Sequence, residues 1–269
     1  MPRRSRLDAE LVRRGLARSR EHASQLVTDG RVTVRGTVAT KPATAVEIDA
    51  AVVVRADVDD PNWASRGAHK LVGALEAFSD IVVDGARCLD AGASTGGFTD
   101  VLLRRGARQV VAVDVGRGLL DWRLRTDERV VVKDKTNVRA LTPDDIGGPV
   151  DLVVADLSFI SLKLVLPALK SCLNPDGDLV PMVKPQFEVG KDRLGSGGVV
   201  RDPELRADAV LTVVAAAAEL GLRLHGVIAS PLPGPSGNVE FFVRLRPGDP
   251  LDAETAAVLV RTAVAEGPQ

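Results

Sequence analysis

Four charged residues stand near the ends of apolar segments, where side chains can reach a bound ligand. Asp156 ends the run VDLVVAD, and Lys184 ends DLVPMVK, where the following Pro185 favours extended backbone. Glu240 lies early in NVEFFVRLR, and Lys70 begins the amphipathic stretch SRGAHKLVGALEAF. Taken singly, each is most often a solvated surface charge. Together, two amines and two carboxylates could take up a proton and hold the resulting charge.

A glycine-rich turn, LDAGASTGGFTD, follows another apolar strand and starts at Leu89. A dinucleotide fingerprint needs G-x-G-x-x-G, and the second glycine after Gly92 is misplaced for it. A phosphate loop needs a lysine where Phe98 stands. The turn therefore suits an adenosine without phosphates, which favours S-adenosylmethionine, although a tight turn that binds nothing is the other interpretation.

An acidic residue, Asp114, closes the next apolar segment, VVAVD. A carboxylate at that strand tip can accept both hydroxyls of a ribose. The candidate cofactor-binding residues are Asp90, Gly92, Ser94, Thr95, Gly96, Gly97, Phe98, Asp114 and Asp156.

Apolar strands alternate with helical segments from residue 67 onward. This alternation predicts an α/β fold with a mostly parallel sheet covered by helices on both faces. The final strand differs, since Val239, Phe241 and Val243 alternate with polar residues, as expected nearer a sheet edge. Ligands in such sheets bind beyond the carboxyl ends of the strands.

Charge is distributed unevenly along the 269 residues, whose formal net charge is −1. Residues 1–41 carry ten basic and four acidic side chains, a local net charge of +6, so the remainder carries −7. A basic module joined to an acidic one is expected when one part of a protein binds the phosphate backbone of a nucleic acid. Two short helices, at 7–15 and 19–30, are each predicted to stop at a glycine, and a strand follows.

Arg18 and Arg20 flank Ser19, a candidate helix N-cap, and a helix N-terminus attracts phosphate. A solvated basic face is the alternative. The stretch from Arg6 to Pro42, however, resembles the small RNA-binding domain named after ribosomal protein S-four. That resemblance favours RNA binding, with the candidate contacts Arg4, Arg6, Arg18, Arg20 and Lys41.

In chain order, Lys70, Asp156, Lys184 and Glu240 resemble the K-D-K-E tetrad of the FtsJ-like ribose 2′-O-methyltransferases. With the basic module in front, nearly the whole chain resembles the TlyA family of ribosomal RNA methyltransferases, some of which carry the name haemolysin. The segments that carry this likeness are SRGAHKL, LDAGASTGGFTD, DLSFISL, VKPQFEVG and PGPSGNVEF.

The resemblance implies a Rossmann-like methyltransferase with a mostly parallel seven-stranded sheet, preceded by a small α+β RNA-binding domain. We expect that RNA-binding domain at 1–59, a linker at 60–66 and the methyltransferase domain at 67–269. The implied substrates are cytidines of 16S and 23S ribosomal RNA in the ribosomal subunits.

Methyl transfer to a ribose hydroxyl benefits from a base, and a free lysine with a pKa near 10.4 is a poor one. A neighbouring ammonium and the sulfonium of the cofactor would lower the pKa of Lys184, whereas Asp156 and Glu240 oppose that change, so the net sign stays open. By resemblance, Lys184 is the base and the other three residues orient it. Phe159 either packs under the next helix, the favoured interpretation, or stacks on an extruded base.

Composition excludes several classes of protein. No apolar run approaches the roughly 18 residues of a membrane span, and two cysteines are too few for a disulfide framework. The three scattered histidines show no zinc-ligand spacing, so no metal is expected. We therefore expect a cytoplasmic monomer without membrane partners. Two alternatives are a membrane-active haemolysin, tested by liposome leakage, and a non-catalytic RNA-binding protein, tested by titration with S-adenosylmethionine.

Overall fold

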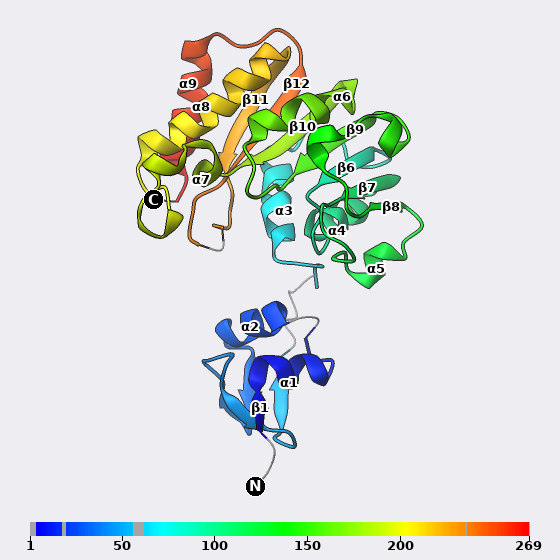
Figure 1. The fold of residues 1–269 in the computed structure, drawn as a ribbon, viewed down its shortest axis with the longest axis vertical. Helices are drawn as coiled ribbons and strands as arrows, with labels where there is room; N and C mark the ends of the chain where they lie inside the picture. Colours follow the sequence, from blue (N-terminus) through cyan, green and yellow to red (C-terminus); the bar gives the residue numbers. More distant parts are fainter. Residues whose placement is uncertain (1–3, 18–19, 56–61, 235, 269) are drawn as a thin grey trace. The chain divides into compact units, whose positions relative to one another are not determined.

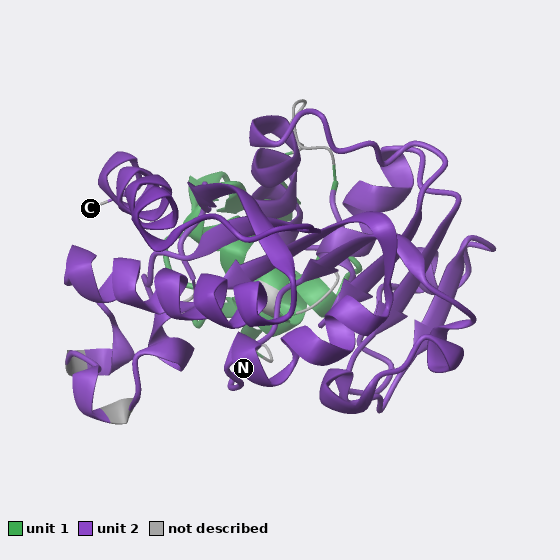
Figure 2. Ribbon diagram, turned by 90° about the horizontal axis from the view of Figure 1, so that it is seen from above, with its two compact units in different colours: residues 1–62 green, residues 63–269 purple. Residues whose placement is uncertain are grey.

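The computed structural model describes residues 4–17, 20–55, 62–234 and 236–268 (Figure 1). The chain divides into two compact units, Met1–Asn62 and Trp63–Gln269, which are coloured separately in Figure 2. Each unit is considered by itself. Arg18 and Ser19, which the sequence predicted at a helix N-terminus, lie outside the described residues, as does most of the segment before Trp63.

The first unit is a small α+β fold around one core. Its helices pack through Leu7, Leu11 and Leu26, which are at most 3% exposed. Both helices are followed by a glycine with positive φ, Gly15 and Gly30, as the sequence predicted. The elements are β1 (Arg4–Arg6), α1 (Leu7–Arg13), α2 (Arg20–Thr28), β2 (Val32–Val34), β3 (Thr37–Val38), β4 (Ala45–Glu47) and β5 (Val52–Val54). β1 pairs with β4, and the other strands form a sheet in the order β3-β2-β5.

The second unit is built on a seven-stranded sheet in the order β11-β12-β10-β9-β6-β7-β8. Of the seven described strands, β12 runs opposite to the other six, so the predicted mostly parallel α/β sheet is confirmed. The strands are β6 (Arg87–Ala91), β7 (Gln109–Val113), β8 (Val130–Lys133), β9 (Val150–Ala155), β10 (Leu173–Val183), β11 (Leu222–Ala229) and β12 (Phe241–Pro247).

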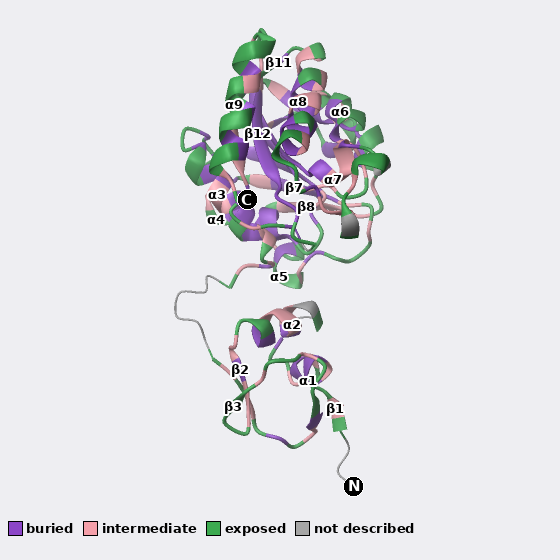
Figure 3. Cartoon of the chain, turned by 90° about the vertical axis from the view of Figure 1, so that its left-hand side faces the viewer, coloured by how far each residue is buried: buried purple, intermediate pink, exposed green. Residues whose placement is uncertain are grey.

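Helices cover both faces of this sheet because successive strand residues point to opposite sides. Cys88 packs in a core cluster with α3 and α4, whereas the next residue, Leu89, packs in a cluster with α6, α8 and α9. In Figure 3 the strands are mostly buried, whereas α9 presents an exposed outer face. The helices are α3 (Gly67–Ala77), α4 (Gly97–Arg104), α5 (Trp122–Arg125), α6 (Leu166–Ser171), α7 (Pro185–Glu188), α8 (Pro203–Glu219) and α9 (Ala253–Glu266).

Short 3₁₀ helices lie within the connections of this unit. They are η1 (Val138–Ala140), η2 (Asp144–Ile146), η3 (Leu162–Leu164), η4 (Lys191–Arg193) and η5 (Ser196–Gly198).

The alternation at the final strand does not mark a solvent-exposed face. β12 is second from the edge, between β10 and the edge strand β11. The polar residues of this alternation, which lie in β12 or just before it, are buried: Asn238 is 2%, Glu240 1% and Arg244 5% exposed. Arg244 donates to Asp178 and Asp80, so acidic partners from elsewhere in the chain compensate its buried charge.

Candidate active site

The strand order alone aligns the predicted site residues along one edge of the sheet. β12, β10, β9, β6 and β7 are consecutive neighbours. Glu240 precedes β12, whereas Lys184, Asp156 and Asp114 directly follow β10, β9 and β7. Because β12 runs antiparallel to the other strands, its start lies at the edge where their carboxyl ends lie. The glycine turn follows β6 at the same edge.

The backbone of the turn after β6 lies in close contact with β7, Asp156 and α3. The Gly92 and Ala93 nitrogens both donate to Val113 O of β7, at 2.8 and 3.1 Å. Gly92 has φ +87°, and a Cβ there would meet Asp156 O at 2.5 Å. Gly97 comes equally close to α3, since a Cβ would lie 2.9 Å from Ala68 N. Glycine is therefore required at these positions by close backbone approach.

Asp114 is fixed by the backbone of this turn and of its own loop. The Ser94 nitrogen donates to Asp114 Oδ2 at 2.8 Å, and the Gly116 nitrogen donates to Oδ1 at 2.7 Å. Ser94 adopts a positive φ of 48°, which turns its N–H toward the carboxylate. Each carboxylate oxygen retains a further lone pair, so Asp114 is oriented and still able to accept ribose hydroxyls.

Asp90 is buried beneath the turn. It is fully buried, accepts a 2.6 Å hydrogen bond from Thr99 Oγ1 at Oδ2, and has no partner at Oδ1 among the described residues. Burial raises the pKa of Asp90 to about 7, against the opposing effect of the Thr99 hydrogen bond. A buried carboxylate oxygen without a partner is the kind of group that a bound cationic ligand would satisfy.

The remaining predicted cofactor residues have different surroundings. Thr95 is exposed, and its carbonyl accepts from the Asp121 nitrogen at 3.2 Å. Gly96 is the αL residue that precedes α4. The Phe98 ring is only 4% exposed and packs on Phe242, with ring centroids 6.0 Å apart. The ring therefore belongs to the core, and the structure does not place the Phe98 side chain in a cofactor site.

Lys184 pairs with Asp156. Its Nζ lies 2.6 Å from Asp156 Oδ1. The geometry of this contact is not that of a hydrogen bond, so we describe it as an ion pair. Nζ also donates to Ser158 Oγ at 2.9 Å. The Lys184 side chain is 9% exposed and that of Asp156 is 25% exposed. The amine therefore lies at the border between the core and the open edge of the sheet.

Lys70 pairs with Glu240 in a second buried ion pair. Lys70 Nζ donates to Glu240 Oε2 at 2.5 Å, and the two side chains are 7% and 1% exposed. The other oxygen, Oε1, is buried and has no hydrogen-bond partner within the described residues. Gly234 closes over it, since a Cβ at that position would lie 2.6 Å from Oε1.

Strand register brings the two ion pairs together. Val183 of β10 pairs with Phe241 of β12 in antiparallel register, so the next position places Lys184 opposite Glu240. On the other side, Ala155 of β9 pairs with Pro181 of β10, which sets Asp156 beside the end of β10. The four predicted tetrad residues thus form two ion pairs at adjoining strand ends.

Phe159 does not pack under the following helix, so the favoured interpretation from the sequence is wrong. The side chain is 91% exposed, at a backbone φ of 63°. Its ring lies 5.2 Å from that of Phe187, which belongs to α7 just after Lys184. The loop is held by Glu188, which accepts from Ser161 Oγ and from the Leu162 nitrogen at 2.5 and 2.7 Å. Burial raises the pKa of Glu188.

Ser158 was not among the residues singled out from the sequence. It stands two residues after Asp156, in the loop that also carries Phe159. Its position two residues after Asp156 was the one feature of the sequence that could have drawn attention to it. Serine is common in loops, so this position alone did not indicate a role. The 2.9 Å hydrogen bond from Lys184 shows that Ser158 belongs to the site.

In the first unit, four of the five candidate RNA contacts lie in described residues. Arg4 is 65% exposed and lies 3.8 Å from Glu47. Arg6 and Arg20 are 53% and 61% exposed, and both bond to Asp8. Lys41 is exposed. Arg18 lies outside the described residues.

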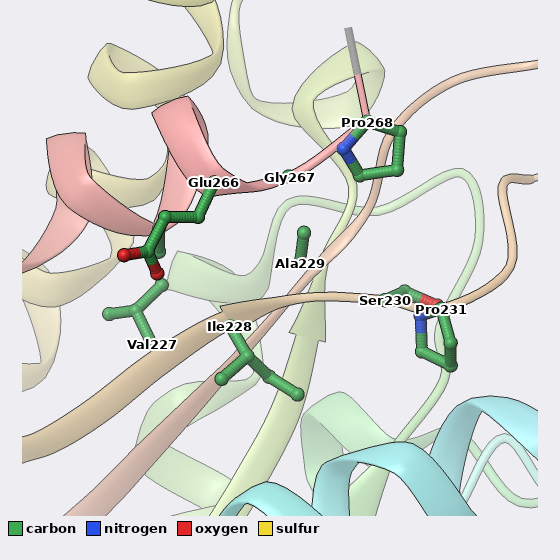
Figure 4. Close-up of a pocket in the computed structure, with 9 residues that line it drawn as sticks. Val227, Ile228, Ala229, Ser230, Pro231, Glu266, Gly267 and Pro268 are labelled. Carbon is green, nitrogen blue, oxygen red and sulfur yellow. The ribbon is translucent and has the colours of Figure 1, made fainter.

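Two cavities lie away from the predicted residues. One, of about 270 Å³, is lined by residues 227–231, Ala263 and residues 266–268, between β11 and the end of α9 (Figure 4). The other, of about 410 Å³, is lined in part by Arg87, Gln109 and Lys133. None of the predicted site residues lines either cavity, so the candidate site is the edge of the sheet.

Two global properties of the described residues bear on function. No helix among them is both long and apolar enough to span a bilayer. Within the same part of the chain, no three or more His, Cys, Asp or Glu side chains gather as a metal site would require. Cys88 and Cys172 are free and buried.

Comparison with family models identifies two domains. The FtsJ-like methyltransferase model matches residues 63–247, and the S4 domain model matches residues 5–52.

Individual relatives match most or all of the chain. A protein of Mycobacterium tuberculosis named 16S/23S rRNA (cytidine-2'-O)-methyltransferase TlyA is 62% identical over 270 residues, covering 100% of both chains. Hemolysin A of Brachyspira hyodysenteriae is 34% identical over 88% of this chain and 97% of its own. A solved structure of a hemolysin-named protein from Streptococcus thermophilus superposes with a TM-score of 0.76 at 36% identity, covering 99% of this chain and 97% of that one.

Proposed function

Because the chain belongs to the TlyA family of FtsJ-like methyltransferases, we propose that it methylates the 2′-hydroxyl of cytidines in 16S and 23S ribosomal RNA, with S-adenosylmethionine as the methyl donor. The observation that carries this proposal is the placement of two ion pairs, the partly buried Lys184–Asp156 and the buried Lys70–Glu240, at strand ends that lie in line with the glycine turn.

The residues of the turn suit the proposed cofactor. Asp114 would accept the ribose hydroxyls, and the unpartnered Asp90 Oδ1 lies beneath the turn where a cationic methionine group could satisfy it. Gly92 and Gly97 let the turn pack directly against Asp156 and α3, which fixes the shape of the turn that would bind the cofactor. When bound, S-adenosylmethionine supplies an electrophilic methyl group on a sulfonium.

Proton removal is the task of Lys184. In its neutral form, Nζ would accept the proton of the 2′-hydroxyl as the oxygen forms its new bond to carbon. Asp156, 2.6 Å away, stabilises the ammonium that results, and Ser158 Oγ accepts from the same nitrogen and fixes its direction. Lys70 and Glu240 form a buried ion pair that holds the neighbouring strand end beside Lys184.

The RNA substrate has to present one ribose to this edge. Phe159 is 91% exposed, and its ring contacts that of Phe187. The two rings offer an apolar surface on the segments that follow Asp156 and Lys184. An extruded cytosine would stack there, since base–aromatic stacking stabilises an unstacked base. The basic first unit, with its S4 domain, would bind a separate part of the RNA.

We further propose that the protein acts as a monomer in the cytoplasm, where ribosomal subunits are assembled. One experiment tests the proposed function: purified protein and S-adenosylmethionine are incubated with unmodified small and large ribosomal subunits, and 2′-O-methylation is mapped on both RNAs. New methylation at cytidine is expected. Absence of any new 2′-O-methyl group on either RNA would refute the proposal.

A further inference from the structure

One buried carboxylate in the first unit fixes two arginines. Asp8, in the first turn of α1, is 3% exposed. Arg6 donates from Nε to Oδ1 at 3.1 Å and from Nη2 to Oδ2 at 2.8 Å, and Arg20 donates from Nη2 to Oδ2 at 3.0 Å. The Ala9 nitrogen adds a bond to Oδ1 at 2.7 Å. The three arginine bonds tie the end of β1 and the start of α2 to one acid, and the Ala9 bond fixes that acid on α1.

The two guanidinium groups remain open to solvent on their other side. Their side chains are 53% and 61% exposed, whereas that of Asp8 is 4% exposed. A guanidinium has five N–H donors, of which Arg6 uses two and Arg20 uses one in these bonds to Asp8. The N–H groups that do not bond to Asp8 lie in the same guanidinium plane, so they can still donate paired hydrogen bonds to a phosphate. The group as a whole carries one net positive charge.

Glu10, two residues after Asp8, shows a different use of a buried acid. It is fully buried and bonds to Arg13 and Arg14. Arg14 is only 20% exposed, and its other nitrogens donate to Ile48 O and Ala50 O. That arginine stabilises the fold internally. Within the described part of the unit, Arg6 and Arg20 donate to Asp8 and to no backbone carbonyl, so the same explanation does not cover them.

We propose that Asp8 is a positioning residue for RNA binding, which holds Arg6 and Arg20 in one arrangement so that their outer N–H groups meet phosphate oxygens. The inference rests on the proposed RNA substrate. A free arginine loses side-chain entropy when it binds, and here the hydrogen bonds to Asp8 restrict both side chains before the RNA arrives. The hydrogen bonds from Arg6 and Arg20 hold the pKa of Asp8 well below its usual range, so the anchor stays charged.

The proposal predicts a result opposite in sign to simple electrostatics. Removing a negative charge near phosphates should tighten RNA binding if charge alone matters. If Asp8 positions the arginines, Asp8→Asn should weaken binding although the protein becomes more positive. Asp29→Asn is the matched control, because it removes the same charge from the same unit at an exposed residue bonded to Gln25.

The experiment uses the full chain and purified ribosomal subunits, with dissociation constants measured over a salt titration. We expect Asp8→Asn to weaken binding about tenfold, a loss that corresponds to disordering one arginine side chain. In methylation assays the KM for subunits should rise while kcat is retained. Asp29→Asn should bind as tightly as the wild type or slightly more tightly.

A double-mutant cycle separates positioning from a general defect in folding. In an Arg6→Ala/Arg20→Ala background, Asp8→Asn should cause no further loss of binding. A further loss of similar size in that background, or binding by Asp8→Asn as tight as that of the wild type, would overturn the inference. So would wild-type affinity of the Arg6→Ala/Arg20→Ala protein. Wild-type protein that binds subunits but transfers no methyl group would instead overturn the proposed function alone.

Discussion

The Ser94 nitrogen donates a 2.8 Å hydrogen bond to Asp114 Oδ2, which joins the glycine turn after β6 to the tip of β7. The carboxylate that would hold the ribose is therefore oriented by the backbone of the turn that would hold the rest of the cofactor.

Replacement of Asp114 by alanine should weaken S-adenosylmethionine binding about tenfold to hundredfold, because hydrogen bonds to a charged acceptor contribute about 1.5–3 kcal/mol. Isothermal titration calorimetry measures the change. Asp134→Ala is the control, because Asp134 lies after the next strand and likewise accepts from a backbone nitrogen, that of Gly118 at 3.1 Å. Equal losses in the two variants would show that Asp114 has no specific role.

Replacement of Lys184 by alanine should lower the rate of methyl transfer by about 10²–10⁴-fold, the range expected for loss of a general base. Cofactor affinity should be unchanged. Lys184→Arg refines the test, since arginine keeps a positive charge beside Asp156 but does not accept a proton near neutral pH. Radiolabel transfer by either variant at the wild-type rate would exclude Lys184 as the base.

Glu240→Gln should destabilise the second unit by about 3–5 kcal/mol, because it leaves the buried Lys70 ammonium without a counter-charge. Chemical denaturation gives the free energy of unfolding. Lys70→Met combined with Glu240→Gln removes both charges and should recover much of the stability without restoring methyl transfer. A double variant no more stable than Glu240→Gln alone would contradict this account of the pair.

Asp90 should make stability depend on pH in a defined window. Its pKa is raised from about 3.8 to about 7, so between these values the unfolded chain releases the proton while the folded protein keeps it. The contribution of this group to the free energy of unfolding is full below pH 3.8, declines as pH rises, and is lost above about pH 7. Asp90→Asn should flatten this slope in thermal unfolding measured across the window. Thr99→Ala removes the hydrogen bond that lowers this pKa and should extend the decline to higher pH.

Phe159→Ala should raise the KM for ribosomal subunits by roughly five- to a hundredfold, which corresponds to the 1–3 kcal/mol of stacking on one base. Stability should not change, because the ring is 91% exposed. Phe159→Trp keeps an aromatic face and should retain activity. Val82→Ala, at a side chain 73% exposed, controls for loss of exposed apolar surface. An unaltered KM in Phe159→Ala would exclude stacking at this position.

Local pattern was sufficient for much of the fold. The alternation of apolar strands with helices predicted the mostly parallel sheet, and the misplaced glycine and missing lysine around Gly92 and Phe98 excluded two kinds of nucleotide turn. These features depend on residues a few positions apart, whose backbone preferences act over short range. The tetrad was found through its resemblance to a family, since each charge alone was better explained as solvated surface.

The tertiary structure alone decided which charges meet. Lys70 and Glu240 are 170 residues apart, and their pairing depends on α3 packing and on the β10–β12 register. Long-range packing also leaves Phe98 buried and Phe159 exposed. It places Ser158 within hydrogen-bond distance of Lys184. In the first unit it brings Arg20 to Asp8, which Arg6 also contacts. A side chain's surroundings are made by residues remote in the chain, so no local pattern specifies them.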